Sequence, residues 1–486
     1  AVYSYHEDTY ALEVLAKYLS EGKNAPLYQN LVSEKELTDR VRMYDYTSEL
    51  AGQLMLQVTA YNEVDLDSVE SAVFETFKNF EAKGIPERDL RRIKAQQETD
   101  FYNSLASVLG KGFQLAQYQI FANDPNYINK DVEKILAVTP EDVKRVYEKY
   151  IKGKHFVATS FVPQAQVALA LENSEEAEVI EEKIVENAEE EVNASADASY
   201  QKTPSSFDRS VEPPYSSAPE LTVPKIWENI LPSGLKVYGI TNNEVPLVKF
   251  SLEMQGGLLL ESPNKVGVSN LLANLMTKGT KNKTPEELEE AIQLLGADIN
   301  VNAEDEKIVL SGSTLAKNYA KTIDLVQEIL LEPRWDSTEF KLVKQQALSR
   351  IQQQKADPNS VANNEFRKLI YGENHILGHN NLGTESSVNN ITLEDLKDYY
   401  SANLSPKRSV FHVVGAIEKE DAVKGIRALS VAWPPKSVKM PEVAQLELPQ
   451  ESQIYFYDVP GAKQSVLRFG APALAATDDD FYAAEV

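Results

Sequence analysis

Hydrophobic positions along the chain repeat with two periods, one typical of helices and one typical of strands. Residues 6–20 and 66–108 carry apolar side chains every three to four positions, which predicts helices, and Pro86 should open a later helix within the second stretch. Residues 53–60 alternate between apolar and polar, which predicts a half-buried strand, and a further strand is predicted at 155–162. Thr139–Asp142 reads Thr-Pro-Glu-Asp, the order of a capping residue, a first-turn proline and first-turn acids, so a helix should begin there. This order of strands and helices indicates an α+β fold of packed layers.

The order of elements recurs, and parts of the sequence recur with it. Val138–Tyr147 resembles Ile391–Tyr400, and both stretches precede a predicted strand. Residues 15–22 and 272–279 share a leucine, an alanine and a glycine at a constant separation of 257 positions. The first domain is therefore interpreted as a diverged copy of the second.

A third copy begins near the end of the chain. Asp480–Val486 matches Asp8–Val14 at five of seven positions, and the strand-like residues 452–476 precede it. The domain at residues 1–165 lacks such opening strands. The sequence is interpreted as a fragment of a longer protein of four half-domains, and residues 452–476 are predicted to add to the unfinished sheet of residues 1–165, either in the same chain or from a second copy.

Repeats and composition divide the chain into four parts: a first domain at 1–165, a linker at 166–225, a second domain at 226–440 and the opening strands of a further half-domain at 441–486. Glu172–Glu191 holds ten glutamates and one lysine, and five prolines follow at 204–224. Such a segment buries too little apolar area to offset its ordering entropy, so an extended linker is expected, with a helix at 175–190 as one local alternative. An acidic tether for a basic partner is the alternative function.

Composition narrows the classes of protein. The chain has 486 residues, 42% of them hydrophobic, which is enough for several cores and about three domains. Its net charge of −25 argues against binding to nucleic acid or to anionic membranes, and no apolar run is long enough to span a bilayer. No signal peptide is found at residues 1–8, and the absence of cysteine excludes disulfides but leaves the redox compartment open.

The stretch with the most chemical information is Asn270-Leu-Leu-Ala273-Asn274. Together with its flanks, residues 256–280 resemble the pitrilysin/insulinase (M16) zinc metallopeptidase pattern G-x-A-H-F-L-E-H-M-x-F-K-G-T. Positions 270, 273 and 274 share one helical face, where an active member carries two zinc-binding imidazoles and a catalytic carboxylate. Here the face carries two amides and a methyl group. The resemblance places Arg350 at the third ligand position, where its charge would repel a dication, so no metal site and no catalytic residue are predicted in this segment.

Later motifs support the same resemblance. Residues 371–386 and 391–396 are similar to the family's Y-G-x-x-H-P-Y-G, G-T-x-E-S-I and I-T-x-x-D-L runs, and 409–415 resembles its closing strand. The plainer interpretation of residues 271–276 is the apolar stripe of an amphipathic core helix. With the later motifs, the resemblance covers about 226–430 and implies tandem M16 half-domains, each a mainly antiparallel sheet covered by helices.

The first domain resembles the noncatalytic second half of an M16 unit, in which an Arg and a Tyr help to hold substrate. The matching positions here are Val32 and Asp39, so that pair is missing too. A shift of register would bring Arg40 or Tyr44 into the same role. The substrate-binding residues therefore stay open.

A second candidate metal group consists of His375, His379 and Glu373. Glycine and asparagine surround these residues, which indicates a loop rather than a helical metal motif. A structural loop is the preferred interpretation.

Two functions are compatible with the resemblance. In the first, this segment is the noncatalytic portion of an M16 zinc metalloendopeptidase and helps to form its peptide-binding chamber, with zinc held by an H-x-x-E-H motif outside the segment. In the second, the protein is a nonpeptidase M16-like subunit that binds peptides or serves as scaffold for an active partner chain. The expected partners are peptides or unfolded polypeptide, and another M16 half. The negative net charge of the chain favours basic peptides. A bacterial periplasm or cell envelope is favoured over the cytoplasm.

Overall fold

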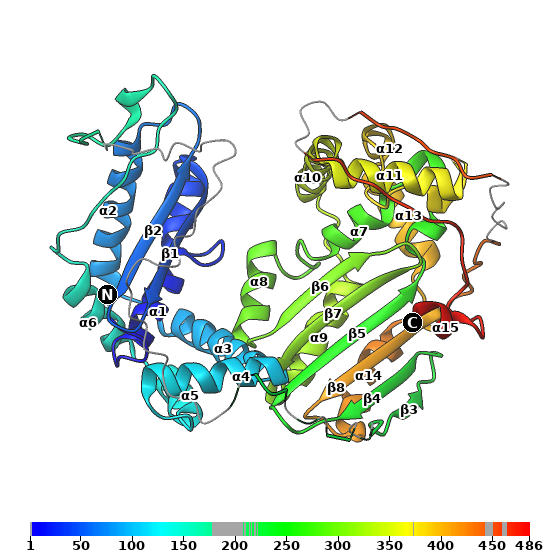
Figure 1. The fold of residues 1–486 in the computed structure, drawn as a ribbon, viewed down its shortest axis with the longest axis horizontal. Helices are drawn as coiled ribbons and strands as arrows, with labels where there is room; N and C mark the ends of the chain where they lie inside the picture. The colour runs from blue at the N-terminus through cyan, green and yellow to red at the C-terminus, as the bar shows by residue number, and fades with distance from the viewer. Residues whose placement is uncertain are drawn as a thin grey trace.

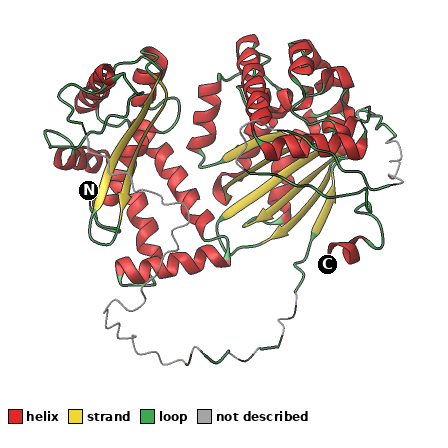
Figure 2. Cartoon of the chain, turned by 45° about the horizontal axis from the view of Figure 1, so that its top comes forward, coloured by secondary structure: helices red, strands yellow, loops and turns green. Residues whose placement is uncertain are grey.

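The computed structural model describes residues 2–176, 222–372, 374–442, 451–458 and 464–486, together with 208, 210–212, 214, 216, 217 and 220. Within them lie two domains, each with its own hydrophobic core. The core of the first domain runs from Val2 to Tyr147, and that of the second runs from Leu231 to Trp433. The two sheets are separate and both are covered by helices (Figures 1 and 2). The α+β fold class is confirmed.

The second domain is built on a six-stranded sheet of order β3-β4-β8-β5-β7-β6. Every adjacent pair is antiparallel except β4 and β8, which are parallel. The strands are β3 (Trp227–Ile230), β4 (Lys236–Thr241), β5 (Leu247–Gln255), β6 (Asp298–Ala303), β7 (Lys307–Leu315) and β8 (Ser409–Gly415). Strand β6 lies at one edge of the sheet. Strand β8 is the last of the six in sequence but lies between β4 and β5, so the sheet is complete only when residues far apart in sequence pair.

Helices cover this sheet and are started by residues that the sequence makes recognisable. They are α7 (Val268–Met276), α8 (Pro285–Leu294), α9 (Tyr319–Leu331), α10 (Ser337–Ala356), α11 (Pro358–Tyr371), α12 (Glu385–Asn390), α13 (Leu393–Asn403) and α14 (Lys419–Ala432). Thr284 and Thr392 each begin a helix with a capping box, in which hydroxyl and carboxylate satisfy backbone N–H groups reciprocally. Helices α9 and α14 pack on each other, while α7 contacts β6, α10 and α13.

The first domain is a β-hairpin packed against helices. Its elements are α1 (Thr9–Ser20), the π-helical η1 (Tyr28–Glu34), β1 (Thr38–Thr47), β2 (Gly52–Ala60), α2 (Leu66–Lys83), α3 (Glu87–Ser104), α4 (Val108–Gln117), the π-helical η2 (Tyr118–Ala122), α5 (Ile128–Ala137) and α6 (Pro140–Tyr150). The helix predicted at 6–20 and the strand predicted at 53–60 are confirmed. The prediction that a later helix opens at Pro86 within 66–108 is confirmed: Gly84, with a φ of 65°, ends α2, and Pro86 caps α3. The helix predicted at Thr139 is confirmed, with a complete capping box to Asp142.

The strand predicted at 155–162 is wrong. These residues have no regular structure, and Phe156 and Phe161 are 64% and 92% exposed. Their counterpart in the second domain is β8, which gains its hydrogen bonds from β4 and β5. Among the residues that the structure describes, no strands equivalent to β4 and β5 lie beside residues 155–162, so a sequence with strand preference lacks the partners that a strand requires.

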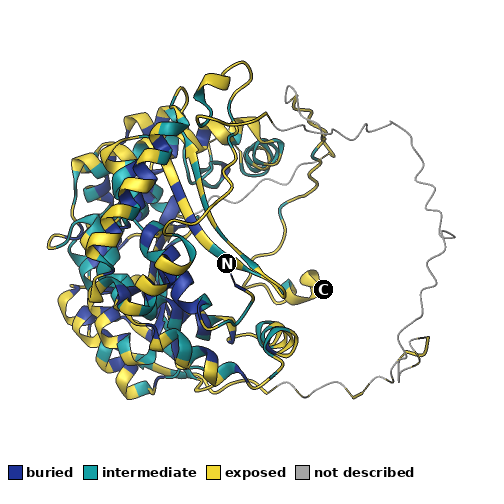
Figure 3. Ribbon diagram, turned by 90° about the vertical axis from the view of Figure 1, so that its left-hand side faces the viewer, coloured by how far each residue is buried: buried dark blue, intermediate teal, exposed yellow. Residues whose placement is uncertain are grey.

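Residues 452–476 do not show the same-chain pairing that was one of the two predicted alternatives, and pairing with a second copy stays a prediction. Their described part, 452–458 and 464–476, forms no strand, and it runs past the helices of the second domain instead of joining the sheet of the first (Figure 1). Gly470 lies against the ring of Phe366 on α11. The chain ends in the short, exposed helix α15 (Phe481–Glu485; Figure 3). The helix considered at 175–190 falls almost entirely outside the described residues.

Two buried carboxylates fasten the helices of the first domain. Asp8, which is fully buried just before α1, accepts hydrogen bonds from Arg145, Lys149 and Tyr150, at 2.5, 2.7 and 2.7 Å. Burial of Asp8 opposes its ionisation, but these three donors outweigh burial and hold its pKa well below the usual range. The ion pairs therefore tie the start of α1 to α6.

The second carboxylate, Asp131 on α5, accepts hydrogen bonds from Tyr10 at 2.7 Å and from Tyr118 at 2.8 Å. Lys134 donates to the hydroxyl of Tyr127 at 2.8 Å. Burial, together with hydrogen bonds to neighbouring groups, raises the pKa of Tyr10 and Tyr118 far above the usual value. This cluster holds α1, η2 and α5 together, with the hydroxyls of Tyr10 and Tyr118 protonated.

Asp45 on β1 gives a pH-dependent prediction. Both of its carboxylate oxygens are buried without a hydrogen-bond donor in the described part of the chain, and burial raises its pKa from 3.8 to about 6. The folded state therefore binds the proton more tightly than the unfolded state, so ionisation costs stability as pH rises from about 4 through 6. We expect Asp45→Asn to raise the free energy of unfolding by about 1 kcal/mol at pH 8, after discounting for partial exposure, and to have no effect at pH 4.

Denaturant unfolding at the two pH values measures this difference. Asp39→Asn, an exposed aspartate on the same strand, is the matched control and should change stability at neither pH. A stability gain from Asp45→Asn that was equal at pH 4 and pH 8 would show that ionisation of Asp45 is not its cause.

Helices α3 and α8 join the two domains. Arg92 donates to the side-chain oxygen of Gln293 at 2.8 Å, and the Thr99 hydroxyl donates to the carbonyl of Gly296 at 2.6 Å. Gly296 has a φ of 56°, and a Cβ placed on it would lie 2.3 Å from the carbonyl oxygen of Ala95. The two backbones therefore approach as closely as they do because residue 296 has no side chain.

Candidate functional site

Helix α7 carries the positions at which the sequence predicts a lost zinc site. The helix begins at Gly267, whose φ of 108° and closeness to the carbonyl of Leu382 leave no room for a Cβ. The buried carboxylate of Glu261 accepts hydrogen bonds from the N–H groups of Gly267 and Ser269, both at 2.7 Å. Burial raises the pKa of Glu261 to about 7, although these donors favour its ionised form. Glu261 thus fixes the first turn of α7, and it takes the place of a side-chain cap.

The face of α7 that carries positions 270, 273 and 274 is closed by its own side chains. Ala273 is fully buried in the core of the second domain, and Asn270 and Asn274 are half-buried. The amide nitrogen of Asn274 donates to the backbone carbonyl of Asn270 at 2.8 Å and to its side-chain oxygen at 3.2 Å. Leu271 and Leu272 belong to the core of the second domain, so the interpretation of residues 271–276 as the apolar stripe of a core helix applies as well. The Asn274 amide is thus held by Asn270, and the two side chains offer no anionic or imidazole ligand.

Arg350 lies on α10, which packs against α7 through Val343, Ala347 and Ile351. The side chain of Arg350 is exposed. An amide pair, a methyl group and a guanidinium do not fit zinc, which binds thiolate, imidazole or carboxylate. In the described part of the chain, no three His, Cys, Asp or Glu residues are grouped in a way that could hold a metal ion. The positions that correspond to the family's zinc site therefore supply no ligand set for a catalytic metal.

This donor set predicts that the purified protein holds no stoichiometric zinc. Elemental analysis after dialysis against zinc-buffered solution should give far less than one zinc per chain, because neither the Asn270–Asn274 pair nor Arg350 can replace water around the ion. The matched control is the variant Asn270→His/Asn274→His, which restores two imidazoles at i and i+4 and should retain more zinc. One zinc per unmodified chain that a chelator removes would contradict this prediction.

The positions aligned with the family's substrate-holding pair are not assembled into a site. Val32 on η1 packs against the core of the first domain, and Asp39 is exposed on β1. The register of β1 against β2 shifts between Thr38 and Val41. At this bulge the Thr38 hydroxyl donates to the carbonyl of Thr59 at 2.5 Å and accepts the N–H of Arg40 at 3.0 Å, so it replaces backbone pairing there. This bulge turns residues 39 and 40 to solvent. The roles considered for Arg40 and Tyr44 stay predictions.

His375 and His379 lie in a loop, as the sequence predicts, on either side of the short 3₁₀ turn Ile376–Gly378. The Nδ1 atom of His375 accepts the N–H of Leu377 at 3.1 Å, which commits that nitrogen to the turn. Burial lowers the pKa of His379, and the neighbouring Lys368 lowers it further. The third member of the candidate group, Glu373, lies outside the described residues.

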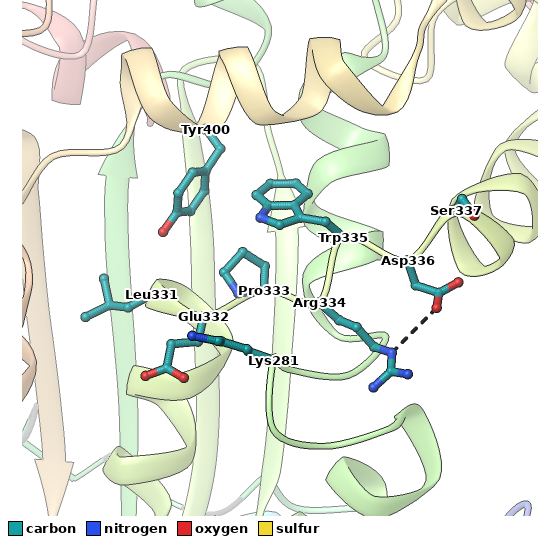
Figure 4. Close-up of a pocket in the computed structure, with 9 residues that line it drawn as sticks. All are labelled: Lys281, Leu331, Glu332, Pro333, Arg334, Trp335, Asp336, Ser337 and Tyr400. Carbon is teal, nitrogen blue, oxygen red and sulfur yellow. Dashed lines mark ion pairs between the residues drawn. The ribbon is translucent and has the colours of Figure 1, made fainter.

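Sequence reasoning did not anticipate a cavity of about 840 Å³ between the α9–α10 connection and α13 (Figure 4). Its wall includes Trp335, whose ring meets that of Tyr400 edge-on at 5.4 Å, and the guanidinium of Arg334, which pairs with Asp336 at 3.6 Å. Trp335 has a φ of 53°, a backbone conformation that sequence patterns do not signal for tryptophan. The Tyr400 hydroxyl donates to the carbonyl of Leu330, so this cavity is shaped by structural contacts.

Two family profiles match the sequence. The profile described as Insulinase (Peptidase family M16) matches residues 237–379, and that described as Peptidase M16 inactive domain matches residues 2–97 and 390–486. The chain belongs to peptidase family M16. The two profiles match separate parts of it and leave residues 98–236 and 380–389 unmatched, and the inactive-domain profile includes the whole hairpin of the first domain.

Some relatives of this M16 protein are named as peptidases and others as non-peptidases. A probable mitochondrial-processing peptidase subunit beta of Arabidopsis thaliana is 24% identical over 209 residues, covering 43% of this chain and 39% of that protein. A non-peptidase homolog, YmxG of Helicobacter pylori, is 23% identical over 232 residues, covering 48% and 52%. A crystal structure of a peptidase M16 inactive domain from Pseudomonas fluorescens has a TM-score of 0.44 at 24% identity, covering 46% and 54%. The chain thus spans about half, or less, of the length of these relatives.

Helices of the described residues contain no segment that is both long and apolar enough to cross a membrane.

Proposed function

We propose that this segment is the noncatalytic portion of an M16 zinc metalloendopeptidase and contributes to a chamber that binds extended peptides. The supporting observation is that α7 has lost its reactive groups while the sheet edge beside it stays open. Strand β6 contacts α7 and pairs with β7 on one side. On its other side, among the described residues, the recorded partner is Asn381, whose amide donates to the carbonyl of Ala303 at 2.9 Å.

An open edge of this kind binds an extended chain through backbone hydrogen bonds, so peptides would be selected by extension rather than by side-chain type. Residues Asp298, Asn300 and Asn302 alternate with buried residues along β6 and face solvent. Asp298 and the net charge of −25 favour basic peptides over acidic ones. In this proposal the active H-x-x-E-H motif and its zinc lie in another half-domain of the complete protein.

Peptide binding without cleavage tests the proposal. A fluorescent basic peptide of about ten residues should bind in an anisotropy titration, and the same peptide with alternate backbone nitrogens methylated should bind at least tenfold more weakly, because methylation removes the donors that pair with a strand. The peptide should remain intact with or without chelator. Equal binding of the methylated peptide, or chelator-sensitive cleavage, would contradict the proposal.

The second candidate function is a nonpeptidase subunit, bound to an active partner chain. It is favoured by the similarity to a protein named a non-peptidase homolog. The two functions differ in whether the complete protein carries an H-x-x-E-H motif elsewhere in its own chain. An H-x-x-E-H motif there supports a single-chain peptidase, whereas its absence supports a scaffold whose purification should carry an active M16 chain with it.

A further inference from the structure

The cavity beside Trp335 takes no part in the function proposed above. It has a volume of about 840 Å³, and none of the residues that line it belongs to α7 or to β6. Sites for small ligands have volumes of about 300–1,000 Å³ and combine apolar walls with a few polar groups. This cavity has both features, so the hydrogen-bonding groups that it leaves unused indicate which kind of ligand it takes.

The two carboxylates at the cavity already have hydrogen-bond donors. Asp336 accepts two backbone N–H groups in the first turn of α10, at 2.7 and 3.0 Å, and pairs with Arg334 at 3.6 Å. Arg334 and Asp336 point toward each other and away from Tyr400 (Figure 4). Glu332 accepts the side-chain amide of Asn282 at 2.9 Å. Neither acid therefore depends on a ligand for its partners.

Two donors at the cavity have no acceptor among the residues that the structure describes. They are the ammonium group of Lys281 and the indole N–H of Trp335. Both nitrogen atoms point toward the side of the cavity on which Tyr400 and Glu332 lie (Figure 4). An ammonium group and an indole nitrogen donate hydrogen bonds and accept none. A ligand that completes this cavity therefore brings acceptor oxygens.

The charge around Lys281 favours a negative ligand. Residues 278–283 hold three lysines and no acid, in a chain with a net charge of −25. Lys283 is paired with Glu328 at 2.6 Å, whereas Lys281 is exposed and has no ion pair in the described part of the chain. The carboxylate of Glu332 would repel a second negative charge. A ligand with one negative group therefore suits the cavity better than one with several.

Trp335 is held beside these donors in a strained conformation. Its φ of 53° is one that bulky residues rarely adopt. Its ring meets that of Tyr400 at 5.4 Å and at an angle of 79°, and the Tyr400 hydroxyl is fixed by its bond to the carbonyl of Leu330 at 2.7 Å. Strained residues of this kind cluster at positions that bind ligands. The two rings form an apolar corner next to the free donors.

We propose that this cavity binds a carboxylate carried on an apolar body. The carboxylate accepts hydrogen bonds from the ammonium group of Lys281 and the indole N–H of Trp335, and the apolar body packs against the rings of Trp335 and Tyr400. A small aromatic or aliphatic acid and the C-terminal residue of a peptide share this chemistry. The site is independent of the β6 edge, because it recognises one charged group instead of the backbone of an extended chain.

Two probes that differ in one group test the proposal. N-acetyl-L-phenylalanine carries the carboxylate, and N-acetyl-L-phenylalaninamide replaces it with a neutral amide. In a ligand-observed NMR titration at pH 7, in a buffer without carboxylates, the acid should bind with a dissociation constant of about 1 mM or lower. The amide should bind about tenfold more weakly, because it lacks the charge that strengthens both hydrogen bonds. Equal binding of the two probes would overturn the proposal.

Lys281→Gln tests the assigned donor. Lys281 is exposed, so this variant should keep the melting temperature, bind the acid about tenfold more weakly and bind the amide as before. Lys321→Gln is the matched control, since it removes the charge of an exposed lysine on α9 that does not line the cavity, and it should change neither affinity. Trp335→Phe keeps an aromatic ring but loses the N–H, so it should also weaken binding of the acid. Binding of the acid that was unchanged in Lys281→Gln would contradict the proposal.

A peptide of about eight residues that ends in phenylalanine distinguishes the two sources of the carboxylate. If its free-acid form binds at least as tightly as N-acetyl-L-phenylalanine, and Lys281→Gln weakens this binding, the ligand is a peptide end. If only the small acid binds in a manner that depends on Lys281, the ligand is a small carboxylate. Binding of neither would refute the proposal. Pairing with the β6 edge depends on peptide N–H groups and not on Lys281, so the failure of one proposal leaves the other standing.

Discussion

Replacing Asp8 by Ala should lower the free energy of unfolding of the first domain by about 3 kcal/mol. The substitution removes two ion pairs and a tyrosine hydrogen bond from one fully buried carboxylate. Arg145 and Lys149 are half exposed and can regain water, which keeps the loss near the lower end of the range for broken buried pairs. Denaturant unfolding followed by fluorescence measures the change.

Asp480→Ala is the matched control, because Asp480 repeats Asp8 in the sequence but is exposed near the end of the chain. It should leave stability unchanged. The pKa of Asp8 is lowered in the folded state, so its contribution is fully present above the unfolded value near 4 and is lost as pH falls through the folded value. The difference between Asp8→Ala and the unmodified chain should therefore shrink in acid. A difference that did not depend on pH would assign the effect to packing instead.

The second large effect is expected at the domain junction. Gly296→Val would place a Cβ 2.3 Å from the Ala95 carbonyl oxygen and 2.6 Å from the Thr99 hydroxyl, at a φ of 56°. The strain of that φ alone costs about 1–2 kcal/mol, and the clash pushes α3 away from α8 and breaks the Thr99 hydrogen bond. We expect the domains to separate while each keeps its fold. Small-angle scattering should show a larger radius of gyration, and calorimetry should show two independent transitions.

Gly84→Val separates the two causes. Gly84 has a similar φ of 65°, but a Cβ there meets nothing within 4 Å. This control should cost the backbone strain alone and leave the radius of gyration unchanged. If Gly296→Val behaved like Gly84→Val, the close approach of α3 and α8 would not be what holds the domains together.

The sequence predicts best where structure is decided locally. The helix starting at Thr139 follows from contacts among four neighbouring residues, all of which are present in its capping box. The emptied face of α7 also follows from spacing along one helix. The pairing of Asn274 with Asn270 was not foreseen, although an i, i+4 amide pair is a signal that could have found it.

Non-local pairing decided the strand that was predicted wrongly. Residues 155–162 have a strand-like sequence, yet they form no strand because no hydrogen-bonding partners lie beside them among the described residues. Residues 465–469 form no strand within this chain either, and their pairing with a second copy stays a prediction. The junction at Gly296 was not predicted, because it depends on elements more than fifty residues apart in sequence. The cavity beside Trp335 was not predicted either, because it also depends on distant elements and on a backbone angle that side-chain patterns do not reveal.

The amide pair on α7 also bears on how this protein can change. Replacing Asn274 by histidine removes both hydrogen bonds to residue 270, whereas replacing Asn270 removes the bond at 3.2 Å and leaves the bond to the backbone carbonyl. A single imidazole gains no metal to compensate, because zinc needs several such ligands at once. A zinc site on this face of α7 would therefore require several simultaneous substitutions, and each single one costs stability before it yields any metal binding.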